Sequence, residues 1–334
     1  MECSERQTTG PSGKASRSLG AIVEGMRVRH WTKNAFVAAP LLFSGRFADP
    51  YAWVECLVAI VAFCALSSGV YLINDVCDRR RDGAHPVKST RPVASGRLSV
   101  VTAVSVAVAH LAVGLVLAAA VVWFTHGPDL PLAGLGPLVW ALAYLVTNLL
   151  YSFWLKAHMI VDVIAVAMGF VFRAMAGAAA IAVPISPWLV VCTFTLCLYL
   201  ALSKRRGEIV QLPPERAGAT RETAGAYRLE DIRHMLSVSA ALAILTYALY
   251  CLAPRTVHRI GSAHMIWTLP LVVYGIFRYH RISLDLPKGD LVSVLLYDKI
   301  IWLTVAAYVV LVAVIIHFGG HPAVRSVLDA EILK

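Results

Sequence analysis

The sequence predicts an all-α protein that crosses a membrane many times, as a polytopic bundle of about nine transmembrane helices. Two observations predict this class. Hydrophobic residues make up 58% of the 334 residues and charged residues only 15%, so most of the chain cannot form the surface of a water-soluble domain. Apolar stretches also recur along the chain, and crossing a hydrocarbon core of about 30 Å takes roughly 20 helical residues.

The expected spans follow one another in a single bundle. The first, residues 34–43, is short and contains Pro40, which makes it the least regular. The others are residues 53–73, 100–124, 131–150, 161–183, 188–202, 235–252, 264–277 and 300–318. Hydropathy locates such spans but does not set their exact ends.

The spans form one expected domain, residues 21–320, with a polar segment on each side. Residues 1–20 are rich in Ser, Gly and Thr and lack the charged and then apolar order of a cleavable signal, which indicates a disordered cytosolic tail. Residues 321–334 are expected to form a short C-terminal tail. The seven cysteines are scattered without a CxxC pair, so we interpret them as small core residues and not as metal ligands.

The formal net charge of +10 indicates membrane topology and not a nucleic-acid partner. Basic residues cluster beside the apolar stretches, at residues 27–33, 79–97, 156, 204–206 and 278–281. By the positive-inside rule these ends are cytoplasmic, which places the N-terminus inside and, with nine spans, the C-terminus outside. Arg255 and Arg259 are exceptions in a connection assigned to the outer side. We therefore expect a multi-pass protein of the cell membrane, with membrane lipid as its solvent and its active site facing the cytoplasm.

The most informative segment covers residues 71–96 and reads YLINDVCDRRRDGAHPVKSTRPVASG. At about 100° per residue, Asn74, Asp75, Asp78 and Asp82 fall on one face of a helix. Carboxylates placed in one stripe repel each other, especially at a membrane boundary, so a cation is expected there. Oxygen ligands favour Mg²⁺, which commonly links one or two carboxylates to phosphate oxygens. Asp75, Asp78 and Asp82 are the predicted metal ligands.

An alternative is a solvated helix in which Arg79, Arg80 and Arg81 pair with the aspartates. The helical spacing argues against it, because those arginines point to the other side. After the stripe, His85, Lys88 and Arg91 lie in a loop where they can hold the outer oxygens of an anion bound to the metal. Positive-inside charge alone is the other interpretation of these three residues.

The segment NDVCDRRRD, residues 74–82, resembles the NDxxDxxxD signature of the UbiA superfamily of intramembrane prenyltransferases. Further blocks resemble one branch of it, the decaprenyl-phosphate phosphoribosyltransferases: HWTKN from residue 30, HPVKSTRP from residue 85, YSFWLK from residue 151, SKRRGE from residue 203 and LLYDK from residue 295. The resemblance implies a nine-helix bundle with a central cavity that opens laterally to lipid and is capped on the cytosolic side.

The resemblance also implies an activity. In that branch, phosphoribosyl diphosphate donates its 5-phosphoribosyl group to a polyprenyl (decaprenyl) phosphate, and the product feeds arabinan synthesis for the cell wall. The cofactor would be Mg²⁺, with Mn²⁺ able to substitute. Asn74 and the three aspartates would hold metal and diphosphate, and the phosphate sites would be lined by Lys88, Arg91, Tyr151, Lys156 and Lys204. A homo-oligomer is compatible with the sequence.

The chain departs from the superfamily at its second acidic motif, DxxxD. Asp162 has His158 one turn before it and Val166 one turn after it, so the motif is reduced to one carboxylate. Asp162 would then bind a second metal, orient Lys156 or a donor hydroxyl, or stabilise the transition state. Asp162, Gly169, Arg173, Ala176 and Ala180 recur at helical spacing on one face. Either the face lines a cavity, which we favour because a buried arginine needs an anion or water, or it packs closely with Arg173 paired internally.

The number of basic residues favours the phosphoribosyl donor. That reaction brings a diphosphate, a 5-phosphate and a lipid phosphate together, and each needs compensating charge away from bulk water. Beyond the acidic stripe the chain offers Lys33, Lys88, Arg91, Lys156, Arg173, Lys204 and Arg205. Two alternatives stay open: a prenyl diphosphate donor with an aromatic or quinone-precursor acceptor, and a membrane transporter whose path contains Asp162 and Arg173.

Overall fold

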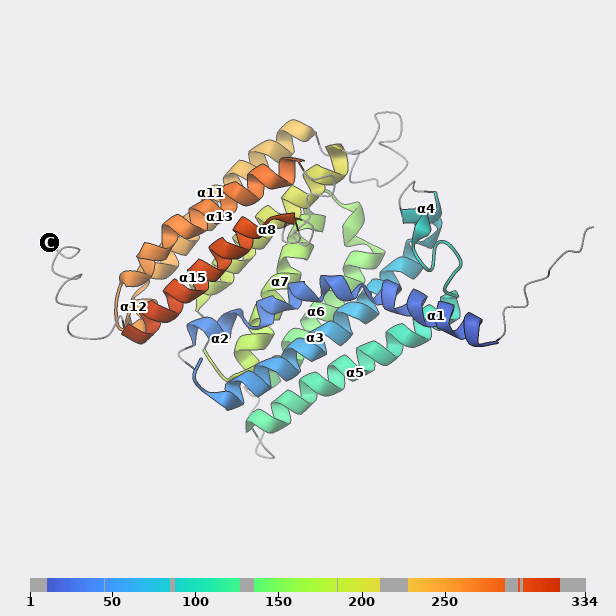
Figure 1. The fold of residues 1–334 in the computed structure, drawn as a ribbon, viewed down its shortest axis with the longest axis horizontal. Coiled ribbons are helices and arrows are strands. Elements are labelled where there is room, and N and C mark those ends of the chain that lie inside the picture. Colours follow the sequence, from blue (N-terminus) through green and yellow to red (C-terminus); the bar gives the residue numbers. More distant parts are fainter. Residues whose placement is uncertain are drawn as a thin grey trace, which may run out of the picture.

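The computed structural model describes residues 11–44, 46–84, 88–126, 135–184, 186–210, 228–285, 294 and 297–318, and every regular element within them is helical. Seven helices are long and apolar enough to cross a membrane: α3 (Pro50–Cys77), α5 (Val100–His126), α6 (Gly136–Phe153), α7 (Val161–Ala180), α8 (Pro187–Val210), α11 (Leu229–Leu252) and α15 (Lys299–Phe318). They run side by side as one bundle (Figure 1). The chain is therefore an integral, multi-pass membrane protein.

A further apolar segment is bent, as in a broken span or a re-entrant loop. Helix α12 (Pro254–Ile260) is followed by the 3-10 helix η6 (His264–Thr268) and by α13 (Leu269–Asp285), and the two arms meet at 96°. Within the described residues the count is thus seven spans, or eight with the bent pair, and the expected nine is not confirmed.

The short first span expected at residues 34–43 is not a single α-helix. Residues 28–37 form the 3-10 helix η1 (Val28–Val37), and α2 (Ala39–Phe43) follows after Ala38. Pro40 sits in the first turn of α2, where its missing N–H is tolerated, so it marks the start of a new helix and not the middle of a long one.

Helices α3 and α5 pack closely against each other along the bundle. A Cβ atom added at Gly69 of α3 would lie 2.9 Å from the carbonyl oxygen of Ala107, and one at Gly114 of α5 would lie 2.9 Å from that of Ala62. Backbones that approach this closely need small residues, as helix pairs in membranes commonly do. This pair carries the acidic segment at its end.

Helix α7 lies at the centre and packs against α3, α6, α8 and η1. Ala176 and Ala180 are buried in an apolar cluster that includes Val37, Phe63 and Tyr144. The small-residue face of α7 is therefore used for close packing. Our preference for cavity lining was wrong for Ala176 and Ala180, because helices α3, α6 and η1 fill the space that these small side chains leave.

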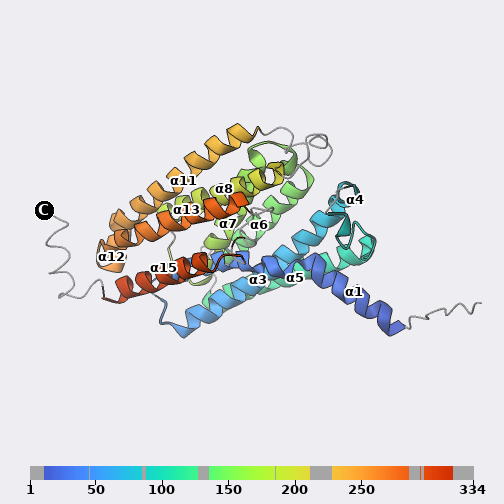
Figure 2. The ribbon, with the colours of Figure 1, turned by 45° about the horizontal axis from the view of Figure 1, so that its top comes forward.

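The first helix begins closer to the N-terminus than expected. Helix α1 (Pro11–Met26) begins inside the predicted tail, and it projects from the bundle near α3 and α5 (Figure 2). Arg97 holds its end through two contacts with Glu24, at 2.7 and 2.9 Å. Residues 1–10 and the expected C-terminal tail, 321–334, lie outside the described part of the chain.

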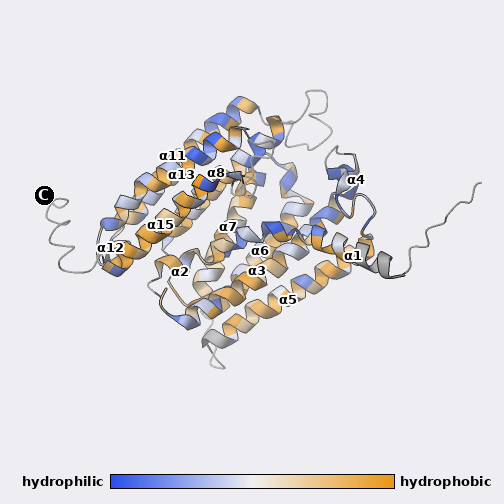
Figure 3. Cartoon of the chain, in the orientation of Figure 1, coloured by the Kyte–Doolittle hydropathy of each residue, from blue (hydrophilic) through white to orange (hydrophobic). Residues whose placement is uncertain are grey.

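The two ends of the bundle differ in composition. Figure 3 shows hydrophobic residues along the helices and hydrophilic residues around α4 (Arg79–Gly83) and the neighbouring helix ends. Helices α2 and α12 lie toward the other end (Figure 1). We call the end that holds α4 the charged end.

Candidate active site at the charged end

The acidic segment spans the junction of α3 and α4. Helix α3 ends at Cys77, but the Asp78 N–H still donates to the Asn74 carbonyl at 2.9 Å, and the Asp82 N–H to the Asp78 carbonyl at 2.8 Å. The near-helical path keeps Asp75 and Asp82 facing inward, at 2% and 5% exposure. Arg79, Arg80 and Arg81 are exposed, so the acidic and the neighbouring basic side chains separate as the spacing predicts.

Two arginines contact the buried carboxylates. Arg91 Nη1 lies 2.6 Å from Asp82 Oδ2 and 3.2 Å from Asp75 Oδ1, so one guanidinium links both aspartates. Arg27 donates to the same oxygen of Asp75, and its guanidinium carbon lies 5.0 Å from the centre of the Tyr71 ring. Arg27 is a functional candidate that the sequence analysis missed, since its only signal was its place beside the first apolar stretch.

The third aspartate, Asp78, forms an ion pair with a lysine that is distant in the sequence. Lys156 Nζ lies 2.6 Å from Asp78 Oδ1, and Asn74 Nδ2 donates to Asp78 Oδ2 at 3.2 Å. Lys156 belongs to the 3-10 helix η4 (Leu155–Ala157) between α6 and α7, and it is 6% exposed. The Oδ1 atom of Asn74 is buried and has no hydrogen-bond partner among the described residues.

A second charged group lies where α7 begins and α8 ends. Asp162 in the first turn of α7 is fully buried, accepts from the Val163 N–H at 2.8 Å and forms an ion pair with Arg205 of α8. Arg205 also pairs with Glu208 one turn further along α8, and it interacts with Tyr151. Its Nε atom is buried without a hydrogen-bond partner among the described residues.

Glu208 is the second residue that the sequence analysis missed. The reduced DxxxD motif had suggested a lone carboxylate, yet the fold brings Glu208 to the same arginine as Asp162. Its signal was its place within the SKRRGE block. Lys204 is exposed and lies 4.0 Å from Glu208 Oε1.

Arg173 is separate from both groups. Its Nε donates to Asn34 Oδ1 at 2.8 Å, Nη1 to the Gly169 carbonyl at 2.9 Å and Nη2 to the Tyr144 hydroxyl at 2.9 Å. These partners are neutral, and Arg173 lies about 16 Å along α7 from Asp162. Its contacts are those of the packing alternative, in which the arginine is satisfied inside the bundle.

The structure thus sorts the predicted site residues by position. The first group, which we call the acidic cluster, contains Asn74, Asp75, Asp78, Asp82, Arg91 and Lys156 together with Arg27. The second, the Arg205 group, contains Tyr151, Asp162, Lys204 and Arg205 together with Glu208. Lys33 in η1 and Lys88 at the start of η2 (Lys88–Thr90) are half-buried and have further interactions, and His85 lies outside the described residues.

The acidic cluster fits Mg²⁺ in its chemistry. Within the described chain no three acidic, histidine or cysteine side chains converge closely enough to hold a metal by themselves. A cationic guanidinium lies between Asp75 and Asp82, and the unpartnered Asn74 Oδ1 adds a hard oxygen donor. Mg²⁺ usually takes only one or two carboxylates and completes its shell with water and phosphate, so the oxygen donors of this cluster are of the chemical type that Mg²⁺ prefers.

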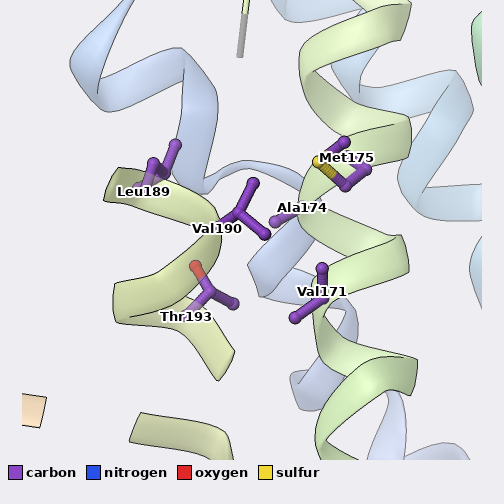
Figure 4. Close-up of a pocket in the computed structure, with 6 residues that line it drawn as sticks. All are labelled: Val171, Ala174, Met175, Leu189, Val190 and Thr193. Atoms are coloured by element: carbon purple, nitrogen blue, oxygen red, sulfur yellow. The ribbon is translucent and has the colours of Figure 1, made fainter. Parts of the chain in front are cut away.

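The structure contains a small apolar pocket in the interior of the bundle, and the expected central cavity stays a prediction. It lies between α7 and α8, and Figure 4 shows its lining: Val171, Ala174, Met175, Leu189, Val190 and Thr193. Val171 is about 13 Å along α7 from Asp162, so the pocket lies away from the charged groups. Its lining suits hydrocarbon and supplies no group for catalysis.

Helices that cross a membrane and bury paired acids and bases at one end define an integral membrane protein with a candidate functional site at that end. The chain belongs to the UbiA prenyltransferase family, whose model matches residues 35–290.

Individual relatives resemble most of the chain. A decaprenyl-phosphate phosphoribosyltransferase of Mycolicibacterium smegmatis is 28% identical over 92% of this chain and 96% of its own length. The Corynebacterium glutamicum protein of the same name is 32% identical over 69% of this chain and 66% of its own length. A UbiA homolog from Archaeoglobus fulgidus, solved with DMAPP and Mg²⁺, has the same fold, with a TM-score of 0.65 and 17% identity over 89% of this chain and 99% of that chain.

Proposed function

We propose that this protein moves the 5-phosphoribosyl group of phosphoribosyl diphosphate onto decaprenyl phosphate. The products would be decaprenylphosphoryl-5-phosphoribose and diphosphate, the former a precursor for cell-wall arabinan. The observation that carries the proposal is the likeness, over nearly the whole of both chains, to a relative named for this activity. Two separate groups of basic residues at one end of the bundle support it, because the reaction must hold several phosphates at once.

The reaction needs no protein nucleophile. An oxygen of the acceptor phosphate forms a bond to the anomeric carbon of the ribose, while the bond from that carbon to the diphosphate breaks and the diphosphate leaves with the electron pair. The acceptor phosphate is already ionised at neutral pH, so no base has to remove a proton. Positioning and electrostatic stabilisation supply the catalysis.

The acidic cluster would bind the diphosphate by an exchange of partners. In the structure, Asp75 pairs with Arg27, Asp82 with Arg91 and Asp78 with Lys156, so three carboxylates neutralise three bases. Bound Mg²⁺, with Mn²⁺ able to substitute, would supply positive charge for the carboxylates and for the departing diphosphate. The bases released from Asp75, Asp78 and Asp82 would then hold the outer phosphate oxygens, Arg91 doing so with two parallel hydrogen bonds. The cluster would therefore both bind the metal and supply the basic side chains that hold the leaving diphosphate.

The Arg205 group would hold a second phosphate. Tyr151, Lys204 and Arg205 lie where α6 and α8 end and α7 begins, and the unpartnered Nε of Arg205 is a donor that a ligand can take. We assign this group to the 5-phosphate of the donor or to the lipid phosphate. Asp162 then acts through Arg205, which it fixes in place, and not as a group that touches the reacting carbon.

The same residues support a cytoplasmic orientation of the charged end. The bases at 27, 79–81, 91, 156 and 204–206 gather at the charged end, so the positive-inside rule puts that end in the cytoplasm, where a soluble phosphoribosyl donor is found. The decaprenyl chain would stay in the lipid of the cell membrane. This orientation supports a site that takes one substrate from water and one from the bilayer.

A test uses the purified protein in detergent with Mg²⁺. Radiolabelled phosphoribosyl diphosphate with decaprenyl phosphate should yield a charged, chloroform-soluble product, with release of diphosphate that depends on the acceptor. The family also contains enzymes that use prenyl diphosphates, so dimethylallyl diphosphate with an aromatic acceptor is run in parallel. Acceptor-dependent diphosphate release from only the prenyl donor would overturn the proposal.

A further inference from the structure

The end of the bundle opposite the acidic cluster carries a pocket with a basic rim. It lies among α2, the connection before α8, the end of α11 and helix α12, and its lining includes Phe43, Ser186, Tyr250, Arg255 and Arg259. Figure 1 shows α12 at the far end of the bundle from α4. The pocket is therefore separate from the groups assigned to the reaction.

Two arginines form the rim. Arg255 and Arg259 are four residues apart, which places them on the same face of α12, and both are exposed. No ion pair joins either of them to an acidic residue in the described part of the chain. Like charges one turn apart disfavour the helix by a few tenths of a kcal/mol unless an anion compensates them. They are also the two bases that the positive-inside rule leaves unexplained.

The inner wall of the pocket offers a polar donor and an aromatic floor. The Ser186 hydroxyl oxygen is buried and has no hydrogen-bond partner among the described residues. Beneath the rim, the rings of Phe43 and Tyr250 meet edge to face with 5.7 Å between their centres. A ligand that pairs with the arginines and the serine must therefore be anionic at one end and compatible with apolar surface at the other.

The surroundings point to lipid. Leu249 and Leu252, on the last turn of α11, and Trp267 of η6 are exposed large hydrophobic residues close to α12 in the chain. Tryptophan and exposed leucines at the end of a span mark the boundary between hydrocarbon and headgroups, where lipid phosphates lie. Guanidinium groups match phosphate oxygens through paired hydrogen bonds.

We propose that the pocket formed by Arg255, Arg259 and Ser186 is a binding site for the phosphate headgroup of an anionic membrane lipid, in the leaflet opposite the acidic cluster. The arginines hold the phosphate oxygens, Ser186 donates a hydrogen bond, and the acyl chains lie along the exposed end of α11. The site does not depend on the proposed transferase activity, and a lipid bound there would link α12 to the end of α11.

The test counts lipids retained by the purified full-length protein in native mass spectrometry. The protein is exchanged into detergent with equal amounts of phosphatidylglycerol and phosphatidylcholine. We expect one retained phosphatidylglycerol, and about tenfold or greater weakening in the double variant Arg255→Gln/Arg259→Gln, because charge-assisted hydrogen bonds are lost. Arg255→Lys/Arg259→Lys should weaken binding less, and Ser186→Ala should weaken it severalfold.

A charge-matched control is Arg228→Gln/Arg233→Gln, which removes two exposed bases near the start of α11, at the other end of that helix. It should retain phosphatidylglycerol as the unchanged protein does. Equal loss in this control, equal retention in the Arg255/Arg259 variant, or equal binding of phosphatidylcholine would overturn the proposal. So would displacement of the lipid by millimolar inorganic phosphate, which would make the pocket a site for the free ion. Since the mutated arginines are exposed, unchanged melting in detergent verifies that each variant is folded.

Discussion

Lys156 and Asp78 form an ion pair of 2.6 Å although they are 78 residues apart in the sequence. The contact ties the connection between α6 and α7 to the end of α3, and Lys156 is almost fully buried there. A buried ammonium that neutralises an expected metal ligand competes directly with the metal for that ligand. In the proposed function, this pair links the charge of the acidic cluster to the binding of metal and diphosphate.

This competition gives the first prediction. In Lys156→Met, Mg²⁺ should bind more tightly in the absence of donor, because Asp78 is no longer neutralised, while turnover falls by about 100-fold or more because the diphosphate loses a cation. Isothermal titration with Mg²⁺ and the radiolabel assay measure the two effects. Arg80→Met, an exposed neighbour, serves as the control and should change neither by more than about twofold. Weaker metal binding in Lys156→Met would contradict the exchange of partners.

The second prediction concerns removal of the metal. Excess chelator should abolish activity, and added Mg²⁺ or Mn²⁺ should restore it. Asp75→Asn, Asp78→Asn and Asp82→Asn should each lower turnover by about 100-fold or more, since a metal that offsets phosphate charge contributes several kcal/mol to the transition state. Melting in detergent checks that the bundle is intact. Activity that survives chelation would remove the metal from the mechanism.

The acidic cluster shows how far the sequence could predict the site. Helical spacing placed Asp75 and Asp82 on the buried side and Arg79 to Arg81 on the exposed side, because the backbone stays nearly helical across the junction of α3 and α4. Helical spacing could not reveal which basic residues contact these aspartates. Arg27 is 48 residues from Asp75, and that contact depends on where η1 packs against α3.

The spans show a similar division. Seven apolar stretches corresponded to seven long helices, since hydropathy reports burial in lipid directly. The sequence did not predict the break at Ala38 or the bend between α12 and α13, because a hydropathy window averages over the local geometry that interrupts a helix. The environment of Arg173 could not be predicted for a different reason. Whether a buried arginine meets an anion or neutral acceptors depends here on Asn34 and Tyr144, which come from other helices.

Topology gives the third prediction. A cysteine at Ser95, in the exposed turn near the acidic cluster, should resist a membrane-impermeant thiol reagent in intact cells, while His258→Cys in α12 should be labelled. The background replaces Cys3, Cys77 and the partly buried Cys192 with serine and keeps the buried Cys56, Cys64, Cys197 and Cys251. Both single cysteines should react after the cells are opened. Labelling of Ser95→Cys from outside, with protection of His258→Cys, would invert the membrane orientation.

The fourth prediction tests the packing of α7 on η1. A Cβ atom at Gly177 would lie 1.8 Å from the Val37 carbonyl oxygen, and a backbone atom cannot move aside as a side chain can. Gly177→Ala should therefore lower the melting temperature in detergent by several degrees, since overpacking costs about 1–3 kcal/mol. Gly20→Ala in α1 has open space around its Cβ and is the matched control. Equal melting of the two variants would show that η1 shifts freely.

The last prediction concerns the two carboxylates that hold Arg205. Asp162 comes from α7 and Glu208 from α8, and both pair with the same guanidinium. If their role is to fix Arg205 for a substrate phosphate, Asp162→Asn and Glu208→Gln should each raise the KM for the phosphoribosyl donor more than they lower kcat. Steady-state kinetics at saturating acceptor separates the two constants.

The effects of the two substitutions on kcat/KM should not be additive. Once either acid is lost, Arg205 is no longer held in one geometry, so the second loss removes less, and the double variant should show a coupling energy of about 0.5–3 kcal/mol in kcat/KM. Arg205→Lys keeps the charge but not the paired hydrogen bonds, and it should reproduce the raised KM. A purely structural ion network would instead lower the melting temperature with an unchanged KM. Additive effects of Asp162→Asn and Glu208→Gln on kcat/KM would mean that the carboxylates act independently, and Asp162 would then be the group that meets the substrate.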